Sequence, residues 1–185
     1  RTSLPQAFDA MRADYEAYAR SHPTAPDLED AAVVNPRLVR RLDMGVEAQQ
    51  TGTGSGFMWD QDGRIVTNFH VVKDALAGGL TVRVVLADGT AYNAAVVGAA
   101  PDYDLAVIQA DTPKDKIHPI TVGTSKDLEV GQKVFAIGNP FGLSLTMTKG
   151  IISALDREIE SLTDRTISGA IQTDAPINPG NSGGP

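Results

Sequence analysis

Beyond about residue 45 the sequence is divided into many short apolar segments separated by turn residues. Of the 18 glycines, only Gly45 lies in the first 50 residues. The short segments have the apolar and β-branched character of strands, and they lie at 38–44, 51–59, 65–69, 80–87, 90–97, 105–108, 131–138, 145–155 and 167–173. Asp88-Gly89 lies between two of them and is a strong hairpin signal. We also expect a turn at 60–63 and a charged loop over 156–166. Short strands at even spacing predict a closed or sandwiched all-β architecture.

The first 37 residues have a different pattern, typical of a helix and a linker. Ser3-Leu4-Pro5-Gln6 is typical of a capped helix start with proline in the first turn. Apolar and aromatic residues then recur at helical spacing, at Phe8, Met11, Tyr15 and Tyr18. We expect an amphipathic helix from Leu4 to Arg20, followed by a proline-containing linker over 21–36. The aromatic face fits packing on its own domain and assembly of an oligomer equally well.

Charge and residue usage exclude several function classes. The formal net charge of −7 argues against binding of nucleic acid or of anionic membrane surfaces, which need a basic face. No apolar run approaches the length that crosses a membrane. The chain has no cysteine, which excludes disulfides and thiolate metal sites, and its three histidines are too scattered for a local metal motif. We therefore expect chemistry without a metal or a cofactor.

The strongest candidate nucleophile is the serine in the run Gly180-Asn181-Ser182-Gly183-Gly184-Pro185. Glycines on both sides allow a tight turn with positive φ and a close approach of substrate. A nucleophilic serine also needs a base and a carboxylate that orients the base. His70 directly follows one expected strand, and Asp104 directly precedes another. Asp102 is the other acidic candidate, but Asp104 adjoins its strand and is preferred.

Two other interpretations of the glycine-rich segments fail on physical grounds. The run 180–184 also fits the nucleophile elbow of α/β hydrolases, but that elbow needs a helix after the serine and a histidine later in the chain. Here Pro185 follows two glycines, and all three histidines precede Ser182. The segment 51–56 lacks the Gly-Lys-Ser/Thr ending of a phosphate loop. We expect His22 in the linker and His118 in a polar connection, both without a role.

The order His70, Asp104, Ser182 on a β-rich chain is that of chymotrypsin-like enzymes. The chain resembles the HtrA/Deg family of trypsin-like serine proteases over residues 38–185. The matching stretches follow one another in the family's order, and they are Gly54-Ser55-Gly56-Phe57, Ile65-Val66-Thr67-Asn68-Phe69-His70-Val71-Val72, Asp104-Leu105-Ala106-Val107, Gly131-Gln132-Lys133-Val134-Phe135-Ala136-Ile137-Gly138-Asn139-Pro140-Phe141-Gly142 and Gln172-Thr173-Asp174-Ala175 continuing to Pro185. Several independent matches in the right order make the resemblance specific.

The resemblance implies an all-β fold of two six-stranded antiparallel β-barrels with the site between them. Residues 1–37 are then the N-terminal helix and linker, 38–122 the first barrel and 123–185 a second barrel that is incomplete in this chain. The first barrel would supply the base and the acid, and the second would supply the nucleophile.

The resemblance also implies a role for each site residue. Ser182 would attack the scissile carbonyl, His70 would transfer the proton, and Asp104 would orient the imidazole ring. The backbone N–H groups of Gly180 and Ser182 would form the oxyanion hole. Ile177 would line a pocket for small or medium aliphatic side chains.

At the level of the whole protein, the resemblance implies an ATP-independent endopeptidase that cleaves unfolded or damaged proteins, in a homo-oligomer built on trimers. The implied location is extracytoplasmic, in the bacterial periplasm or envelope, with the chloroplast as a second choice. A non-catalytic interaction or chaperone-like module with the protease fold stays open as an alternative. In the family, further strands and often PDZ domains follow Pro185. We therefore expect residues 1–185 alone to be inactive, because no later strand supports the nucleophile turn.

Overall fold

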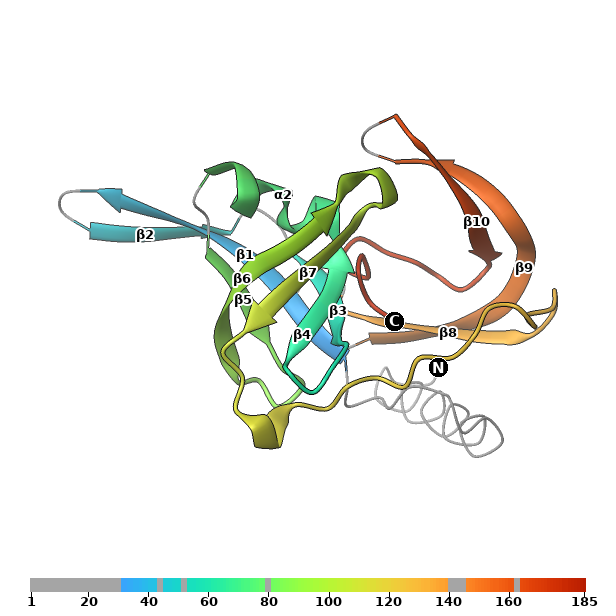
Figure 1. Ribbon diagram of the computed structural model, residues 1–185, viewed down its shortest axis with the longest axis horizontal. Helices are drawn as coiled ribbons and strands as arrows, with labels where there is room; N and C mark the ends of the chain where they lie inside the picture. Colours follow the sequence, from blue (N-terminus) through green and yellow to red (C-terminus); the bar gives the residue numbers. More distant parts are fainter. Residues whose placement is uncertain (1–30, 43–44, 51–52, 79–80, 140–145, 162–163) are drawn as a thin grey trace, which may run out of the picture.

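The computed structural model describes residues 31–42, 45–50, 53–78, 81–139, 146–161 and 164–185. These residues form two β units joined by a long connection, with one α-helix on the first unit (Figure 1). The helix expected from Leu4 to Arg20 and the linker residues 21–30 lie outside the described residues.

The first unit is a closed antiparallel barrel of six described strands. They follow one another around the barrel as β1, β3, β4, β7, β6 and β5, and pairing of β5 with β1 closes the ring. Their bounds are β1 Ala31–Leu42, β3 Gly54–Met58, β4 Arg64–Asn68, β5 Thr81–Val85, β6 Ala91–Ala100 and β7 Leu105–Ala110. A further strand, β2 (Gly45–Gln50), pairs with residues 37–42 of β1 as a projecting hairpin (Figure 1). The predicted six-stranded first barrel is confirmed.

Strand β1 starts earlier than the sequence pattern predicts. We expected a linker up to residue 36 and a strand over 38–44, whereas β1 covers Ala31–Leu42. The linker prediction is therefore wrong for its last six residues. Pro36 lies inside β1, opposite Val82 of β5. Proline argues against a strand because it lacks the N–H that a ladder needs, but β1 pairs with β3 as well as with β5, and local sequence does not report these distant partners.

Alternating side chains of the strands fill the interior of the first barrel. Val84 of β5 and Ile108 of β7 have 0% of their surface exposed, because successive strand residues point to opposite faces. The connection after β7 adds Ile117 to this core. Farther along it, the N–H of Ile120 donates to the carbonyl of Met58 at 2.9 Å. The connection therefore stays attached to the first barrel as far as Ile120.

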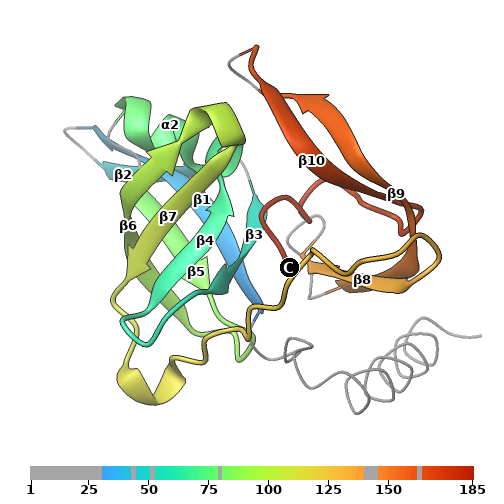
Figure 2. The ribbon, with the colours of Figure 1, turned by 45° about the vertical axis from the view of Figure 1, so that its right-hand side comes forward.

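The second unit is a curled antiparallel sheet of three described strands, in the order β10-β9-β8. These strands are β8 (Lys133–Gly138), β9 (Thr146–Glu160) and β10 (Thr166–Thr173). Figure 2 shows β9 curving from β8 to β10, with the C-terminal segment returning between the two units. The predicted all-β fold of two barrels, the second incomplete, is confirmed as a closed barrel beside a curled half-barrel.

Residues 156–166, which we expected to be a charged loop, are largely strand. β9 continues to Glu160, which pairs with Thr166 at the start of β10. The turn between them is closed by a hydrogen bond from the N–H of Ser161 to the carbonyl of Arg165 at 2.8 Å. The loop prediction failed because charged side chains are compatible with a strand when they face solvent, as residues 156–160 do.

A helix, α2 (Phe69–Gly78), follows β4 where the sequence pattern predicts only a strand over 65–69. The strand ends at Asn68, and the helix packs Val71 and Val72 onto the barrel with 9% and 0% exposure. Paired valines favour strands in local sequence reasoning because they are β-branched. Burial of the two valines against the barrel outweighs this strand preference, and the segment forms a helix.

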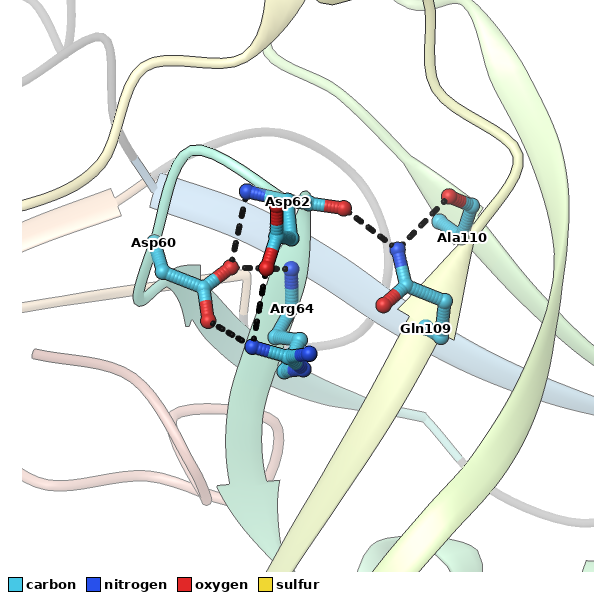
Figure 3. A network of polar contacts seen from close by, with 5 residues as sticks. All are labelled: Asp60, Asp62, Arg64, Gln109 and Ala110. Carbon is cyan, nitrogen blue, oxygen red and sulfur yellow. Dashed lines mark hydrogen bonds and ion pairs between the residues drawn. The ribbon is translucent and has the colours of Figure 1, made fainter.

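A polar network closes the turn between β3 and β4 (Figure 3). The carboxylate of Asp60 accepts hydrogen bonds from the N–H groups of Asp62 and Arg64, both at 3.1 Å. The guanidinium of Arg64 lies 2.7 Å from the Asp60 carboxylate and 3.1 Å from that of Asp62. The side chain of Gln109 donates to the carbonyl of Asp62 at 2.7 Å. The turn predicted at residues 60–63 is confirmed, and Gln109 ties it to β7.

The hairpin turn predicted at Asp88-Gly89 is confirmed, and it carries an ion pair. Gly89 has a φ of +80°. The Asp88 carboxylate accepts the N–H of Thr90 at 2.8 Å and pairs with Lys116, which lies in the short 3₁₀ helix η3 (Lys114–Lys116) of the connection. The hydrogen bond from Lys116, assisted by that from Thr90, lowers the pKa of Asp88 from 3.8 to about 2.

We expect Lys116→Met to raise the pKa of Asp88 back toward 3.8. Because the pKa is lower in the folded state, the pair stabilises the fold fully above about pH 4, and this contribution is lost as the pH falls to about 2. The effect on stability is small and weakens with salt, since both groups are exposed. NMR titration of the Asp88 carboxyl measures the shift, with Lys114→Met as the matched control. The same Asp88 pKa in Lys116→Met as in the parent would contradict the prediction.

Candidate active site

The register between β4 and β7 brings His70 and Asp104 together. Asn68, the last residue of β4, pairs with Leu105, the first residue of β7. His70 lies two residues after Asn68, in the first turn of α2, and Asp104 immediately precedes Leu105 at the end of the 3₁₀ helix η2 (Pro101–Tyr103). The two candidate residues therefore meet at one end of the first barrel.

The backbone of Asp104 is held in a left-handed conformation, with a φ of +52°. This region is uncommon for residues other than glycine, and aspartate is among those that tolerate it best. The carbonyl of Asp104 accepts hydrogen bonds from the N–H of Phe69 at 3.0 Å and from the side-chain amide of Asn68 at 2.8 Å. Its N–H donates to the carbonyl of Pro101 at 3.0 Å. These bonds fix the direction in which the carboxylate points.

Both oxygens of the Asp104 carboxylate bind His70. Oδ2 lies 2.7 Å from Nδ1 of the ring, and Oδ1 accepts the backbone N–H of His70 at 2.9 Å. The carboxylate is an acceptor, so Nδ1 carries the ring proton when the imidazole is neutral, and Nε2 is left to accept a proton. The His70 side chain is 36% exposed and that of Asp104 is 21% exposed. The ring can therefore reach a substrate while the carboxylate stays largely covered.

The candidate nucleophile lies on a tight turn. Gly180 and Gly183 have φ values of +102° and +84°, which favour glycine. The N–H of Asn181 donates to the carbonyl of Asn178 at 3.0 Å and closes the turn. The side chain of Ser182 is half-buried, and its hydroxyl makes no hydrogen bond within the part of the chain that the structure describes. Among the described residues, no hydrogen bond joins this hydroxyl to His70, whose ring and backbone N–H bind Asp104.

Ser55 of β3 holds this turn against the first barrel. Its N–H donates to the carbonyl of Ser182 and its hydroxyl donates to the carbonyl of Gly180, both at 2.7 Å. Gly54 allows the close approach, since a Cβ there would lie 2.6 Å from the methyl groups of Val71 and 3.1 Å from the Ser182 carbonyl. Val71 belongs to α2, so the turn that carries Ser182 lies beside the helix that carries His70.

The second unit holds the chain on either side of the turn. The carboxylate of Asp174 accepts the N–H of Ile151 at 2.7 Å, and a Cβ at Gly150 would overlap that carboxylate. At the other end, the N–H of Ile137 donates to the carbonyl of Pro185 at 2.9 Å. The turn is thus anchored to both β units.

The groups predicted to form an oxyanion hole and a substrate pocket stay predictions. The N–H groups of Gly180 and Ser182 donate to no protein acceptor among the described residues. Ile177 lies on the loop before the turn and is 57% exposed. Both observations are compatible with the expected roles.

The architecture, a closed barrel facing a curled half-barrel, matches that of known proteins. The sequence profile of the trypsin-like peptidase domain matches residues 54–185. The solved structure of Deg5 is similar with a TM-score of 0.72 and 40% sequence identity, over 93% of this chain and 79% of that chain. The chain belongs to the HtrA/Deg family of trypsin-like peptidases.

Curated members of the HtrA/Deg family show the same relationship. Protease Do-like 1, chloroplastic, of Arabidopsis thaliana is 60% identical over 135 residues, which are 72% of this chain and 30% of the relative. Protease Do-like 5, chloroplastic, of the same plant is 51% identical over 141 residues, 72% of this chain and 44% of the relative. A probable periplasmic serine endoprotease, DegP-like, of Chlamydia trachomatis is 48% identical over 132 residues, 71% of this chain and 25% of the relative. The chain spans less than half the length of these relatives.

Other candidate residues of this HtrA/Deg chain lie outside the pair. Asp102 is exposed on η2, and His118 is exposed in the connection between the units. His22 lies outside the described residues. Within the described ranges, no group of three or more His, Cys, Asp or Glu side chains is placed to hold a metal ion. Nor does any described helix have the length and apolar character to span a membrane.

We expect Gly183→Ala to disrupt the nucleophile turn. A Cβ at this position would overlap the carbonyl of Ser55 and the hydroxyl of Thr67, and it would lie 2.8 Å from the N–H nitrogen of Asn68. The left-handed conformation should cost about 1–2 kcal/mol of the free energy of unfolding, and the overlap about 1–3 kcal/mol more. Urea unfolding and peptide turnover measure the two effects.

Gly89→Ala is the matched control. Gly89 has nearly the same φ, +80°, but nothing lies within 4 Å of a Cβ built there. Gly89→Ala should lose only the part of the free energy of unfolding that is due to backbone conformation, and it should keep full turnover. Equal destabilisation of the two variants would show that the close packing around Gly183 does not contribute to the free energy of unfolding.

Proposed function

We propose that this chain carries the catalytic centre of a serine endopeptidase that acts through Ser182, His70 and Asp104. The observation that carries the proposal is the 2.7 Å contact between Nδ1 of His70 and Oδ2 of Asp104, beside the Ser182 turn. A carboxylate at that position keeps the ring proton on Nδ1, so that Nε2 can take the serine's proton. Relatives named as proteases and as a serine endoprotease support the same class of reaction.

In the proposed reaction, Oγ of Ser182 attacks the carbonyl carbon of the scissile peptide bond while Nε2 of His70 takes its proton. Asp104 stabilises the resulting imidazolium. The N–H groups of Gly180 and Ser182 would bind the oxyanion, and each such donor is worth about 3 kcal/mol of transition-state stabilisation. His70 then protonates the leaving amine. Water, activated by the same ring, hydrolyses the acyl-enzyme and restores the serine.

Unfolded or damaged proteins are the proposed substrates, and cleavage would need no ATP. This proposal is supported by the resemblance to the HtrA/Deg family. The exposed side chain of Ile177 offers an apolar wall beside the turn. Such a wall favours cleavage after small or medium aliphatic side chains.

We also propose an extracytoplasmic or chloroplast location and a homo-oligomer built on trimers. The relatives are named as chloroplastic in Arabidopsis thaliana and as periplasmic in Chlamydia trachomatis, which supports the two locations. The family resemblance supports the trimer, and light scattering of the purified protein tests it.

The proposed reaction is tested with a fluorophosphonate label and an unfolded protein such as casein. In the complete protease that contains residues 1–185, the parent should be labelled and should cleave casein, and Ser182→Ala should do neither. The alternative is a non-catalytic or chaperone-like module with the protease fold. A parent that binds casein and suppresses its aggregation, without cleavage and without labelling, would favour the alternative.

A further inference from the structure

We propose that Ser55 is a positioning residue for the reaction, which sets the nucleophile turn in register with His70. The inference rests on the proposed function. Ser55 lies on β3 of the first barrel, and its partner Gly180 lies 125 residues later in the chain. Ser55 is 1% exposed and is not part of the apolar core cluster of the barrel. Ser55 is therefore buried among polar contacts and not in the apolar core.

The N–H, the carbonyl and the hydroxyl of Ser55 are all engaged. The N–H donates to the carbonyl of Ser182 and the hydroxyl donates to the carbonyl of Gly180, both at 2.7 Å. The same hydroxyl accepts the N–H of Asn139 at 2.9 Å, and the Ser55 carbonyl accepts the hydroxyl of Thr67 at 2.7 Å. A buried residue whose polar groups are all paired holds its neighbours rigidly, because losing any partner leaves an unsatisfied group.

The two carbonyls that Ser55 binds belong to the two residues proposed to supply the oxyanion donors. A peptide group is planar, so a bond to the carbonyl of Gly180 also fixes the N–H of Asn181. That N–H donates to the carbonyl of Asn178 at 3.0 Å, which holds the plane at both ends. The bond to the Ser182 carbonyl fixes a second peptide plane, which joins Ser182 to Gly183. Ser55 thereby restrains the peptide plane before Asn181 and the peptide plane after Ser182, and the N–H of Ser182 belongs to the plane between them.

The other partners of Ser55 connect the turn to the base and to the second unit. Thr67 lies on β4, three residues before His70, and its hydroxyl would overlap a Cβ at Gly183. Asn139 directly follows β8 of the second unit. One buried hydroxyl thus bridges the unit that carries the base and the unit that leads to the nucleophile. The relative placement of Ser182 and His70 depends on a residue that does not touch substrate.

The experiment is steady-state kinetics of Ser55→Ala in the complete protease that contains residues 1–185, with a peptide substrate. Misplacement of reacting groups by about 1 Å costs about 10²-fold, so we expect kcat to fall by about that factor with little change in KM. The pH dependence of kcat/KM should stay that of the parent, because the contact between His70 and Asp104 is intact. Affinity for a peptide aldehyde, which forms a tetrahedral adduct on the serine, should fall by the same factor as kcat/KM. Ser55→Thr keeps the hydroxyl and should recover part of the loss.

Two controls separate positioning from general stability. Val84→Ala creates a cavity in the core of the first barrel, on β5, which pairs with β1 and β6, and it should keep the parent kcat when assayed below its melting temperature. Thr67→Val removes only the hydrogen bond to the Ser55 carbonyl and should give a smaller fall in kcat. This variant also decides the matter if Ser55→Ala does not fold.

Each outcome bears on the inference. Full kcat in Ser55→Ala, or in Thr67→Val if Ser55→Ala is unfolded, would overturn it. A loss of kcat in Val84→Ala as large as that in Ser55→Ala would also overturn it, because the effect would then be one of stability. A parent that fluorophosphonate does not label would overturn the proposed function and this inference together. A labelled parent with an unimpaired Ser55→Ala would overturn the inference alone.

Discussion

Replacing Ser182 with alanine is expected to lower the turnover of an unfolded substrate by about 10⁶-fold, which corresponds to about 8 kcal/mol of transition-state stabilisation. Alanine removes the oxygen that attacks the scissile carbonyl, so no acyl-enzyme can form. What remains is attack by water with help from the backbone donors of the turn. The loss should appear in kcat, because Ser182 makes its decisive contribution in the transition state.

Initial rates of casein cleavage by the complete protease measure this effect, and Ser125→Ala is the control. Ser125 is an exposed serine in the connection between the units, and its variant should keep the parent rate. His70→Ala should cost about as much as Ser182→Ala, and the double variant should cost no more, because the residues act as one unit. A Ser182→Ala protein with more than about a hundredth of the parent rate would contradict the proposed nucleophile.

Asp104→Asn is expected to lower kcat by about 10⁴-fold, as loss of the orienting carboxylate does in a serine triad. One carboxylate oxygen of Asp104 already accepts the backbone N–H of His70 at 2.9 Å, and the other lies 2.7 Å from Nδ1. The single oxygen of asparagine would keep the bond to the backbone N–H. Its NH₂ group would then face Nδ1, which forces the ring proton onto Nε2. In that tautomer His70 cannot take the proton of Ser182.

Asp102→Asn is the matched control, since Asp102 lies two residues earlier and is exposed on η2. It should keep the parent kcat. Thermal unfolding shows whether either variant has lost its fold. If Asp104→Asn kept kcat within tenfold of the parent, or if Asp102→Asn lost as much as Asp104→Asn, the assignment of the orienting carboxylate would be wrong.

Elements bounded by strong turn signals were predictable from the sequence. The hairpin turn at Asp88-Gly89 needs a residue with positive φ, and Gly89 has a φ of +80°. The turn at residues 60–63 likewise depends on contacts within a few residues, between Asp60 and Arg64. In both cases the partners lie close together in the chain, so local sequence contains the information that forms the turn.

Elements whose partners are distant were mispredicted. β1 was expected from residue 38 because the contacts of residues 31–36 with β3 and β5 cannot be seen locally. Helix α2 was missed because Val71 and Val72 favour a strand until their burial against the barrel is known. The strands of the hairpin at 146–173 were predicted to be too short, because exposed charged residues are typical of a loop and also of a strand that faces solvent.

The sequence by itself determined the family, the β-rich class and the residue types of the candidate site. Turn residues, strand periodicity and the order of His70, Asp104 and Ser182 can all be identified directly in the sequence. Only the tertiary structure decided which groups meet. It placed Oδ2 of Asp104 at 2.7 Å from His70 through the register of β4 and β7, and it brought Ser55 to Gly180 across 125 residues. The physical reason is that closing a long loop depends on the summed contacts of the whole barrel, and no local segment encodes that sum.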